Sequence, residues 1–525
     1  MNFPLPLLRP QPRSTYAGAE SPRLGLLSDQ RLPLFLLLLG LLQVLMWGVG
    51  ALAFSSTDLD SSEQLVWGTA LEAGYWKHPP LPSWIMHAAL AAFGPSAWLP
   101  LVISQLGVIV ALALVWRLSR EFLPTRQAAL SVLLTSLVFY HNGAADTYNH
   151  NTAMLPFQAA TVLAFFFAAR RGDMRWWAAA GLFAGLSMLV KYVAVLPLAG
   201  LVLYLMFDRS LHHRRTFAGV ALAAAIFALV ISPHVVWLYS NDFPPMKYAH
   251  SVMQPLVGAK AHFASVVHYL LTQFYRFAPV LPALIFLAFQ RRRADVVTQL
   301  PLAQRDKLFI WLAGVAPLAM TVLFGLVTHN KLEPRWGANV FLLSGLLAVM
   351  LMRPVLTPRM LKRVIAITVV MQVLICAGSI ISKTAIADHK GQRTRANFPA
   401  AELAQSTRLV WHSYTDAPLR IIASDFWLGG NLRAFGLPDA EVMIDGDAAK
   451  SPWVTPEDLY NCGAMVLDDQ ITDRRAGSPQ APELDAMIAS APASGTFNLA
   501  WGSDGQERHS VRWAYLPPHS PTLCR

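Results

Sequence analysis

Four residues in the stretch 58–84, DLDSSEQLVWGTALEAGYWKHPPLPSW, have a spacing that could serve chemistry. The spacing i, i+3, i+4, i+7 puts two carboxylates, an amide and an indole on one helix face: Asp60, Glu63, Gln64 and Trp67. A carboxylate in this setting can act as a general base. The pattern DSSE also fits a capping box, with Asp60 as the N-cap and Glu63 reaching back to it. The two interpretations are compatible.

A second polar cluster, YHNGAADTYNHNT, occupies residues 140–152 and contains a single carboxylate, Asp146. The amides of Asn149 and Asn151 suit sugar hydroxyls. Polar groups beside an apolar bundle are costly unless they face water or a ligand, although an ordinary polar turn also fits. His141 and His150 resemble a metal pair, but no third ligand follows at a useful spacing, so we expect no metal site.

Several cationic or imidazole side chains fall in the same set of loops: Lys77, His78, Lys191, His329, Lys331 and Arg335. Cations are unusual on the non-cytoplasmic side of a membrane protein. They could hold an anionic lipid phosphate through charge-assisted hydrogen bonds, or they could reach up to ordinary phospholipid headgroups.

The elements that position these residues are predicted to be membrane helices. Of the 525 residues, 54% are hydrophobic and only 14% charged, and the mean hydropathy is +0.41, which together indicate a polytopic membrane protein. The net charge of +11 does not indicate a nucleic-acid partner, because the arginines cluster in alternate loops. These loops are predicted to be cytoplasmic, together with a disordered tail over residues 1–32.

About eleven membrane spans are predicted between residues 33 and 382. They lie near 33–54, 98–116, 128–140, 153–169, 176–190, 192–207, 217–238, 264–288, 308–327, 337–352 and 363–381. Residues 83–94 are too short to cross and are expected to lie in the interface. Lys191 then sits in a tight reversal between two short spans. The outer loops are 55–97, 141–152, 239–263 and 328–336, which contain all the polar clusters described above.

Residues 383–525 are expected to form a small soluble α/β domain on the outer side. Short β-like runs at IIAS, AEVMID and GAMVLDD alternate with helix-like stretches. The Gly-Gly pair in IIASDFWLGGNLRAF is not a nucleotide-binding fingerprint. Cys462 and Cys524 both fall here and could be either paired or free.

The stretch LDSSEQLVWGTALEAGYWKHPPLPSW resembles the first outer loop of the GT-C membrane glycosyltransferases of the glycosyltransferase 39 type. These include protein O-mannosyltransferases, the aminoarabinose transferase acting on lipid A, and the rhizobial lipopolysaccharide galacturonosyltransferases. Asp60 matches the family's catalytic aspartate, whereas Ser61 stands where a glutamate is usual. His78 stands where the aminoarabinose transferase has a phosphate-binding lysine, and Lys77 precedes it. GAADTYNHNTAMLPF and LVKYVAVLPL are similar to the family's next two outer segments.

The resemblance implies a GT-C fold and transfer of a sugar from a polyprenyl-phosphate carrier, at the outer face of a bacterial inner membrane, to lipid A, lipopolysaccharide core, another glycan or a protein. It implies catalytic roles for Asp60, Glu63 and Asp146, and substrate binding by Lys77, His78, Asn149, Asn151, Lys191 and Arg335. The carrier stores the bond energy, so no nucleotide or other cofactor is expected. A transporter of a lipid-linked sugar is the alternative, although transporters tend to place ionisable residues near the midplane.

Overall fold

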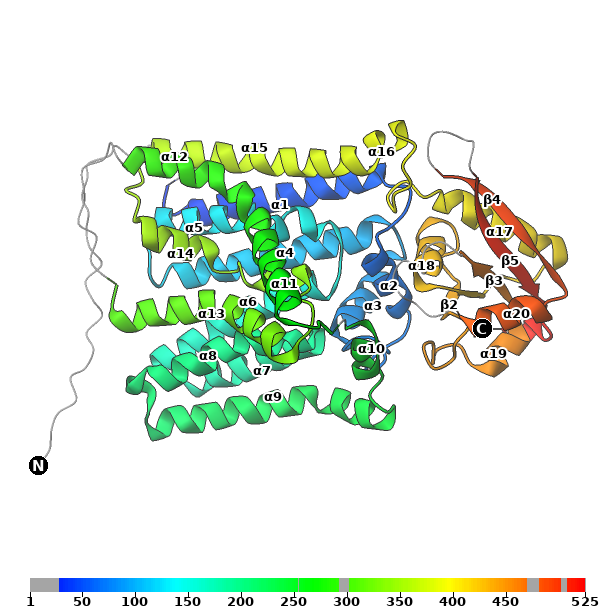
Figure 1. Cartoon of the computed structure of the whole chain (residues 1–525), viewed down its shortest axis with the longest axis horizontal. Helices are drawn as coiled ribbons and strands as arrows, with labels where there is room; N and C mark the ends of the chain where they lie inside the picture. The colour runs from blue at the N-terminus through cyan, green and yellow to red at the C-terminus, as the bar shows by residue number, and fades with distance from the viewer. Residues whose placement is uncertain (1–27, 254, 292–301, 470–480, 502–507, 525) are drawn as a thin grey trace, which may run out of the picture.

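The computed structural model describes residues 28–253, 255–291, 302–469, 481–501 and 508–524. It consists of a long helical bundle and a smaller sheet-containing part at one end of it (Figure 1). We call that end of the bundle the domain end. The predicted tail over residues 1–32 lies almost entirely outside the described residues.

Seven helices in the described part of the chain are long and apolar enough to cross a membrane. They are α1 (Leu32–Gly50), α4 (Trp98–Ser119), α6 (His150–Arg171), α9 (Arg214–Ser240), α11 (Ala259–Phe277) continuing into α12 (Leu281–Arg291), α13 (Gln304–Thr328) and α15 (Pro358–Lys383). An eighth span forms if α5 (Thr125–Leu137) is counted with Phe139–Asp146, which bends away from it by 90°. The chain is therefore a multi-span membrane protein, as predicted, but the described residues contain seven or eight helices of spanning length where about eleven spans were predicted.

Two shorter apolar helices, α7 (Met174–Val190) and α8 (Val195–Phe207), flank Lys191. This arrangement confirms the predicted tight reversal. The predicted span 337–352 differs, because its only α-helix is α14 (Ser344–Met352). Nine residues rise about 14 Å, roughly half the hydrocarbon thickness. The preceding residues Pro334–Asn339 form a 3-10 turn that instead brings Arg335 toward the domain end.

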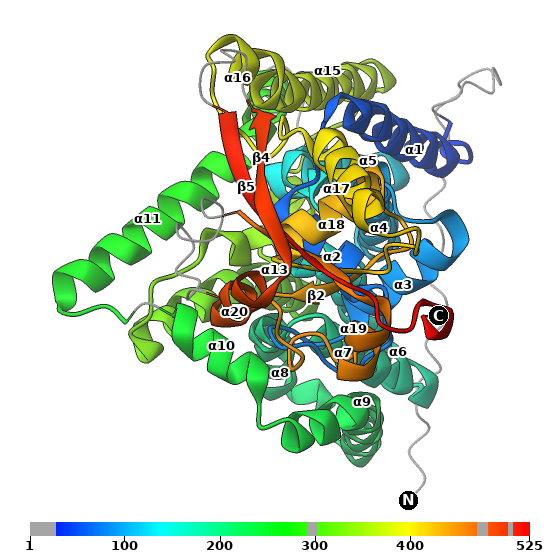
Figure 2. The same ribbon diagram turned by 90° about the vertical axis from the view of Figure 1, so that its right-hand side faces the viewer.

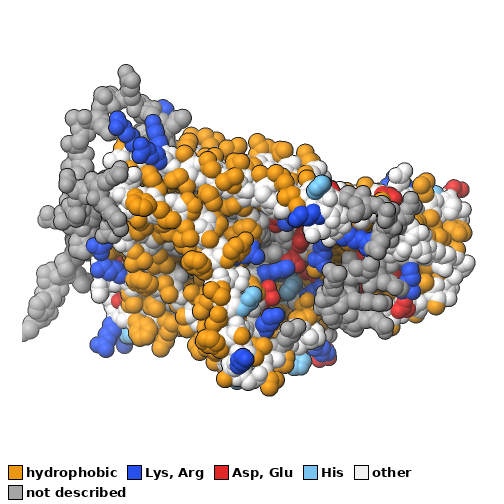
Figure 3. Space-filling view, turned by 45° about the horizontal axis from the view of Figure 1, so that its top comes forward, with side chains coloured by type: hydrophobic (Ala, Val, Ile, Leu, Met, Phe, Trp, Pro, Cys, Tyr) orange, Lys and Arg blue, Asp and Glu red, His pale blue; other side chains and the backbone are white. Residues whose placement is uncertain are grey.

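The surface shows the charge separation expected of a membrane protein (Figure 3). Apolar side chains cover the middle of the bundle, and Leu229 and Val236 on α9 are 71% and 65% exposed. Lys and Arg side chains gather at the end opposite the sheet, whereas acidic, basic and His side chains mix where the bundle meets it (Figure 3). The apolar band fits a lipid environment.

Polar side chains inside the bundle hold the bent segment Phe139–Asp146 in place. Gln105 on α4 donates to the carbonyls of Asn142 and Ala145 at 3.3 and 3.1 Å, and Gln43 on α1 donates to Gln105 at 2.8 Å. His141 is buried between the carbonyls of Thr135 and Ala338. His141 and Asn142 therefore serve the fold rather than a cavity.

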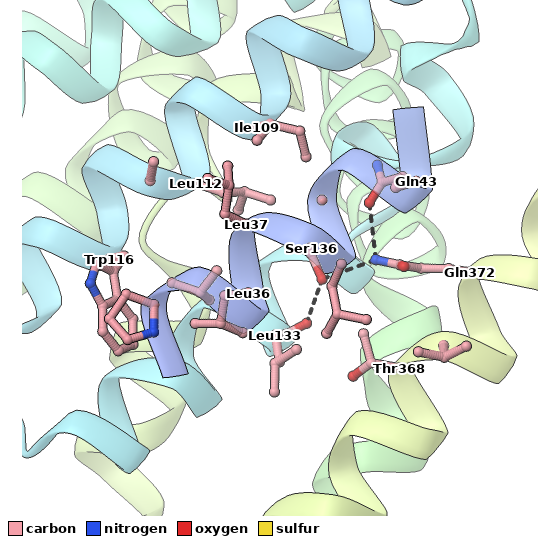
Figure 4. A pocket seen from close by; sticks show the side chains of 16 residues that line it. Leu36, Leu37, Gln43, Ile109, Leu112, Trp116, Leu133, Ser136, Thr368 and Gln372 are labelled. Carbon is pink, nitrogen blue, oxygen red and sulfur yellow. Dashed lines mark hydrogen bonds between the residues drawn. The ribbon is translucent and has the colours of Figure 1, made fainter. Parts of the chain in front are cut away.

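A pocket of about 240 Å³ lies among α1, α4, α5 and α15 (Figure 4). Its walls are mostly apolar, and Gln372 donates to Gln43 and Ser136 at 3.0 and 3.3 Å on one side of it (Figure 4). It shares no lining residue with the candidate site described below.

Three short helices cover the domain end: α2 (Leu59–Trp67), α3 (Leu81–Phe93) and α10 (Pro244–Val252) (Figure 2). Helix α3 has 13 residues and rises about 20 Å, which is too short to cross a bilayer. This agrees with the interfacial helix predicted near residues 83–94.

The C-terminal part contains the predicted α/β fold. Its sheet has the strand order β2-β1-β3-β5-β4, with β1 (Ile421–Ser424) parallel to β2 (Glu441–Ile444) and β3 (Ala464–Asp468). Strand β5 (Arg508–Leu516) is antiparallel to β3 and to β4 (Ala493–Ala500). The helices are α17 (Ala400–Tyr414), α18 (Phe426–Phe435), α19 (Pro456–Cys462) and α20 (Pro482–Ser490), and a disulfide joins Cys462 to Cys524.

Candidate active site

A cavity of about 700 Å³ opens at the domain end, beside α2. Eight of the nine residues predicted to form a site line it: Asp60, Glu63, Lys77, His78, Asn149, Asn151, Lys191 and Arg335. None of these eight residues comes from the outer loop 239–263, but that loop also lines the cavity through Tyr248 and its neighbours. We call this space the large cavity. The fold thus brings together loops that are up to 275 residues apart in the chain.

Helix α2 starts two residues earlier than its motif predicts. Asp58 is the N-cap, and its side chain accepts a hydrogen bond from the amide of Asp60 at 3.3 Å. The predicted capping box of Asp60 and Glu63 is therefore wrong, because Asp60 already lies in the first turn. This frees both carboxylates to face the large cavity, since neither is needed to cap the helix.

Asp60 is only 25% exposed and lies 3.1 Å from Arg335. The Arg335 side chain is 64% exposed, so water screens this pair and its strength is small. A ligand can therefore take over the guanidinium at little cost. The neighbouring Ser61, which replaces the acid usual in the resembling family, is buried and accepts a hydrogen bond from the Tyr148 amide at 3.1 Å.

Glu63 and Lys77 form a buried ion pair with a separation of 2.7 Å. Burial alone would lower the pKa of Lys77, but the attraction of Glu63 outweighs it and holds that pKa above its usual value. The ammonium also lies 3.8 Å from the ring centre of Phe426 on α18 and 4.6 Å from that of Trp76. Lys77 is therefore a charged group whose charge is already balanced.

His78 and His150 meet at the floor of the cavity, with ring centres 4.0 Å apart. Burial, together with the nearby His150 and Lys191, lowers the pKa of His78 well below its usual value. His78 is thus neutral at pH 7 and cannot supply the positive charge predicted for it at that position.

Lys191 is the cation best placed to receive an anion. Its ammonium donates to the Asn151 amide oxygen at 2.9 Å, and none of the ion pairs found within the described ranges includes it. Burial lowers the pKa of Lys191 to about 8, so it stays mostly charged at pH 7. Asn149 caps α6 by accepting from the amides of Asn151 and Thr152, which orients this corner of the cavity.

The structure does not bring Asp146 into the large cavity. It lines a second cavity of about 270 Å³ together with Asp58, Ser61, Lys383 and Arg395. Asp146 forms an ion pair with Lys383 there. Burial raises the pKa of Asp58, and the charges of Asp60 and Asp146 add to that shift. The start of α2 therefore lies between the two cavities, and the carboxylates on its two sides still affect one another electrostatically.

Helix α18 of the C-terminal part rests directly on α2 (Figure 2). Asn431 accepts from the Thr57 amide at 2.7 Å and donates to the Ser62 hydroxyl at 3.2 Å. The Trp427 indole donates to the Thr57 carbonyl at 2.9 Å. Gly430 lies so close to Ser62 that a Cβ atom would come within 2.5 Å of its carbonyl oxygen. The C-terminal part thus fixes the helix that carries Asp60 and Glu63.

Sequence reasoning missed several residues of these cavities, namely Asp58, Glu333, Lys383 and Arg395. A signal existed for Lys383, which ends the last apolar run on the side where cations are unusual. Arg395 carried no such signal, because nothing in the sequence indicates that its loop turns back toward α2.

Comparisons with known proteins found similar glycosyltransferases. Residues 77–237 match the dolichyl-phosphate-mannose-protein mannosyltransferase family. The lipopolysaccharide core galacturonosyltransferase RgtA of Rhizobium johnstonii is 29% identical over 74% of this chain and 77% of its own length. The lipid A galacturonosyltransferase RgtD of the same organism is 23% identical over 60% of this chain and 65% of its own length.

A solved structure shares the fold. ArnT from Cupriavidus metallidurans, crystallised with undecaprenyl phosphate, superposes with a TM-score of 0.61 over 91% of this chain and 97% of its own. The sequence identity is 16%.

Proposed function

We propose that this chain, which shares the GT-C fold and is similar to membrane glycosyltransferases, transfers a sugar from a polyprenyl-phosphate carrier to an acceptor at the outer face of a bacterial inner membrane. The observation that carries the proposal is that one cavity contains both a carboxylate, Asp60, and a cation, Lys191. Lys191 forms no ion pair with an acidic residue in the described structure and donates to Asn151 instead. Group transfer from a lipid phosphate needs a base on one side and a positive charge on the other.

In this proposal the acceptor hydroxyl oxygen attacks the anomeric carbon of the sugar. The bond from that carbon to the phosphate oxygen breaks, and its electron pair leaves with the polyprenyl phosphate. Asp60 takes the hydroxyl proton. Lys191 and Arg335 stabilise the charge on the departing phosphate, and Arg335 moves to it from Asp60. Asn149 and Asn151 orient the sugar, and an acceptor that is itself a phosphate would need no base.

The second cavity would hold the acceptor, which Asp146 would contact from the cavity wall. Its wall carries two cations, Lys383 and Arg395, beside the carboxylates Asp58 and Asp146, and these cations would hold an anionic group of the acceptor. The named relatives act on lipopolysaccharide core and lipid A, so we place the acceptor of this chain among such glycolipids.

The sugar would be a uronic acid, the class that these relatives transfer. The large cavity supports this choice, because it is lined by four cations, Lys77, Lys191, Lys331 and Arg335, and by three carboxylates, Asp60, Glu63 and Glu333. The cations outnumber the carboxylates by one, which suits an anionic donor.

The orientation follows from two features. The arginines that end α6 and those that begin α15 fall at the end opposite the sheet, which favours a cytoplasmic position for that end by the positive-inside rule (Figure 1). The disulfide between Cys462 and Cys524 suits an oxidising compartment. Both features support a periplasmic location of the cavities. A transporter is not favoured, because the ionisable residues lie at one edge rather than at the midplane.

The test is mass spectrometry of lipids and lipopolysaccharide from cells that lack the gene and carry either the wild-type chain or Asp60→Asn. We expect the variant to lose transfer by about 10²- to 10⁴-fold at normal expression, while the sugar-loaded carrier accumulates. Asp242→Asn is the control, since Asp242 is 84% exposed and lines neither cavity. Full transfer by Asp60→Asn would refute the role of this carboxylate.

A further inference from the structure

We propose that Glu63, His78 and His150 form a binding site for one divalent ion of the zinc class. Each residue offers one ligand atom, and the three atoms lie within 4.8 Å of one another. Zinc bonds of about 2.0 to 2.1 Å in a tetrahedron put ligand atoms roughly 3.3 Å apart. The side chains therefore need to close by no more than about 1.5 Å, a movement that side-chain rotation can supply.

His150 provides an independent observation. The residue is 4% exposed, and its Nε2 atom has no hydrogen-bond partner in the part of the chain that the structure describes. Its ring is held by a hydrogen bond to the backbone of Pro79, which has only a carbonyl to offer. A histidine that donates one ring N–H to a carbonyl presents its other nitrogen as a lone pair, which is the usual arrangement of a metal-binding histidine.

The donor set selects the kind of ion. Two imidazoles and one carboxylate are the three protein ligands of several zinc enzymes, which leave a fourth position open. Calcium and magnesium prefer sites made of oxygen atoms. Sequence spacing could not reveal this site, because two of its ligands, Glu63 and His78, come from the first outer loop, whereas the expected partner of His150, His141, is bonded elsewhere.

Lys77 is the competitor for the ion, since its ammonium lies 2.7 Å from Oε2 of Glu63. A carboxylate has two oxygens, so Glu63 can keep Lys77 on one and offer the other. Lys77 also retains its contacts with the rings of Phe426 and Trp76. Removing this ammonium should therefore tighten ion binding rather than weaken it.

The role of the ion in catalysis rests on the proposed function. Its open position would face the donor phosphate and supply the positive charge that the neutral His78 lacks. Binding of the ion itself does not depend on that function and can be measured without any substrate.

The experiment is a titration of the full chain in detergent, first stripped with a chelator, with Zn²⁺ or with Co²⁺ as an optical probe. We expect one ion per chain. His150→Gln should weaken binding by more than about tenfold, because even the loss of an outer-shell partner costs 10- to 100-fold. His329→Gln is the matched control, since His329 and His262 form another histidine pair, 3.1 Å apart, on the surface.

Two further variants keep the test decisive if His150→Gln folds poorly. His150→Cys should still bind Co²⁺ and should add a thiolate-to-cobalt absorption, and Lys77→Met should bind more tightly than the wild type. The proposal is overturned if the wild type binds no stoichiometric ion, or if His150→Gln binds as well as His329→Gln. A chain that binds the ion but transfers no sugar would count against the proposed function alone.

Discussion

Gly430 is the position where a single added carbon should disturb the candidate active site most directly. In Gly430→Ala the new Cβ atom would lie 2.5 Å from the Ser62 carbonyl oxygen and 2.8 Å from the Ser62 Cα, and ordinary contact begins at 3.4 Å. The atoms on the other side of the contact are backbone, so no side chain can turn away. Helix α2 must therefore move by about 0.9 Å relative to α18.

Ser62 precedes Glu63 and follows Asp60 by two residues, so the movement is passed to both carboxylates. A displacement of about 1 Å in a catalytic group can cost about 100-fold in rate. We expect Gly430→Ala to lower kcat by about that factor. The assay is transfer by purified protein from a synthetic polyprenyl-phosphate sugar to extracted lipopolysaccharide.

Gly429→Ala is the matched control in the same helix. Its Cβ would press on the side chain of Val442, 2.4 Å away and within the C-terminal part, and not on α2. Gly378→Ala, with nothing within 4 Å, controls for the substitution itself. Equal losses in the two α18 variants would mean that general damage to the C-terminal part, and not displacement of α2, explains the effect. Full activity in a folded Gly430→Ala would refute the reasoning.

Three further predictions concern charge and covalent structure. Affinity for undecaprenyl phosphate should fall as pH rises from 7 to 9.5, because burial lowers the pKa of Lys191 to about 8 and the ammonium loses its charge in that range while the phosphate stays ionised. A binding isotherm at each pH checks this. Lys191→Met should flatten the dependence of affinity on pH, although Asp60, Glu333 and Arg335 remain. Lys383→Met should destabilise the protein by roughly 1 to 3 kcal/mol, because it leaves the buried Asp146 carboxylate without its cation. The control Lys390→Met should not destabilise it. Equal melting temperatures of the two variants would contradict this prediction. Mass spectrometry after alkylation should find Cys462 and Cys524 protected until the protein is reduced, whereas alkylation of both cysteines without reductant would show that they are free. Cys462→Ser should lower the stability of the C-terminal part by about 4 kcal/mol, because the disulfide closes a loop of 62 residues.

The membrane architecture was largely predictable from the sequence, because apolar run length and alternating arginine clusters reflect the bilayer directly. The reversal at Lys191 and the interfacial helix α3 are examples. The span predicted over 337–352 was not reliable, because composition alone does not distinguish a helix from the 3-10 turn that Pro334 begins.

Residue types at the site could also be predicted, but their partners could not. Asp60, Glu63 and Lys191 were identifiable from spacing and from the side of the membrane. The rotation of α2 about its axis decides that Glu63 pairs with Lys77 and that Asp146 lines another cavity. The turn is set by the cap at Asp58 and by Asn431, and contacts over 374 residues leave no local pattern.

The contact between α18 and α2 also bears on the order in which the protein is made. Thr57 and Ser62 enter the membrane region among the first segments, whereas Asn431 is synthesised about 370 residues later. At 5 to 20 residues per second this interval is roughly 20 to 70 s. Throughout it the polar atoms of α2 lack the partners that fix the helix. The nascent chain therefore inserts with its cavity unassembled, and the site becomes complete only when the last-made part of the protein folds onto it.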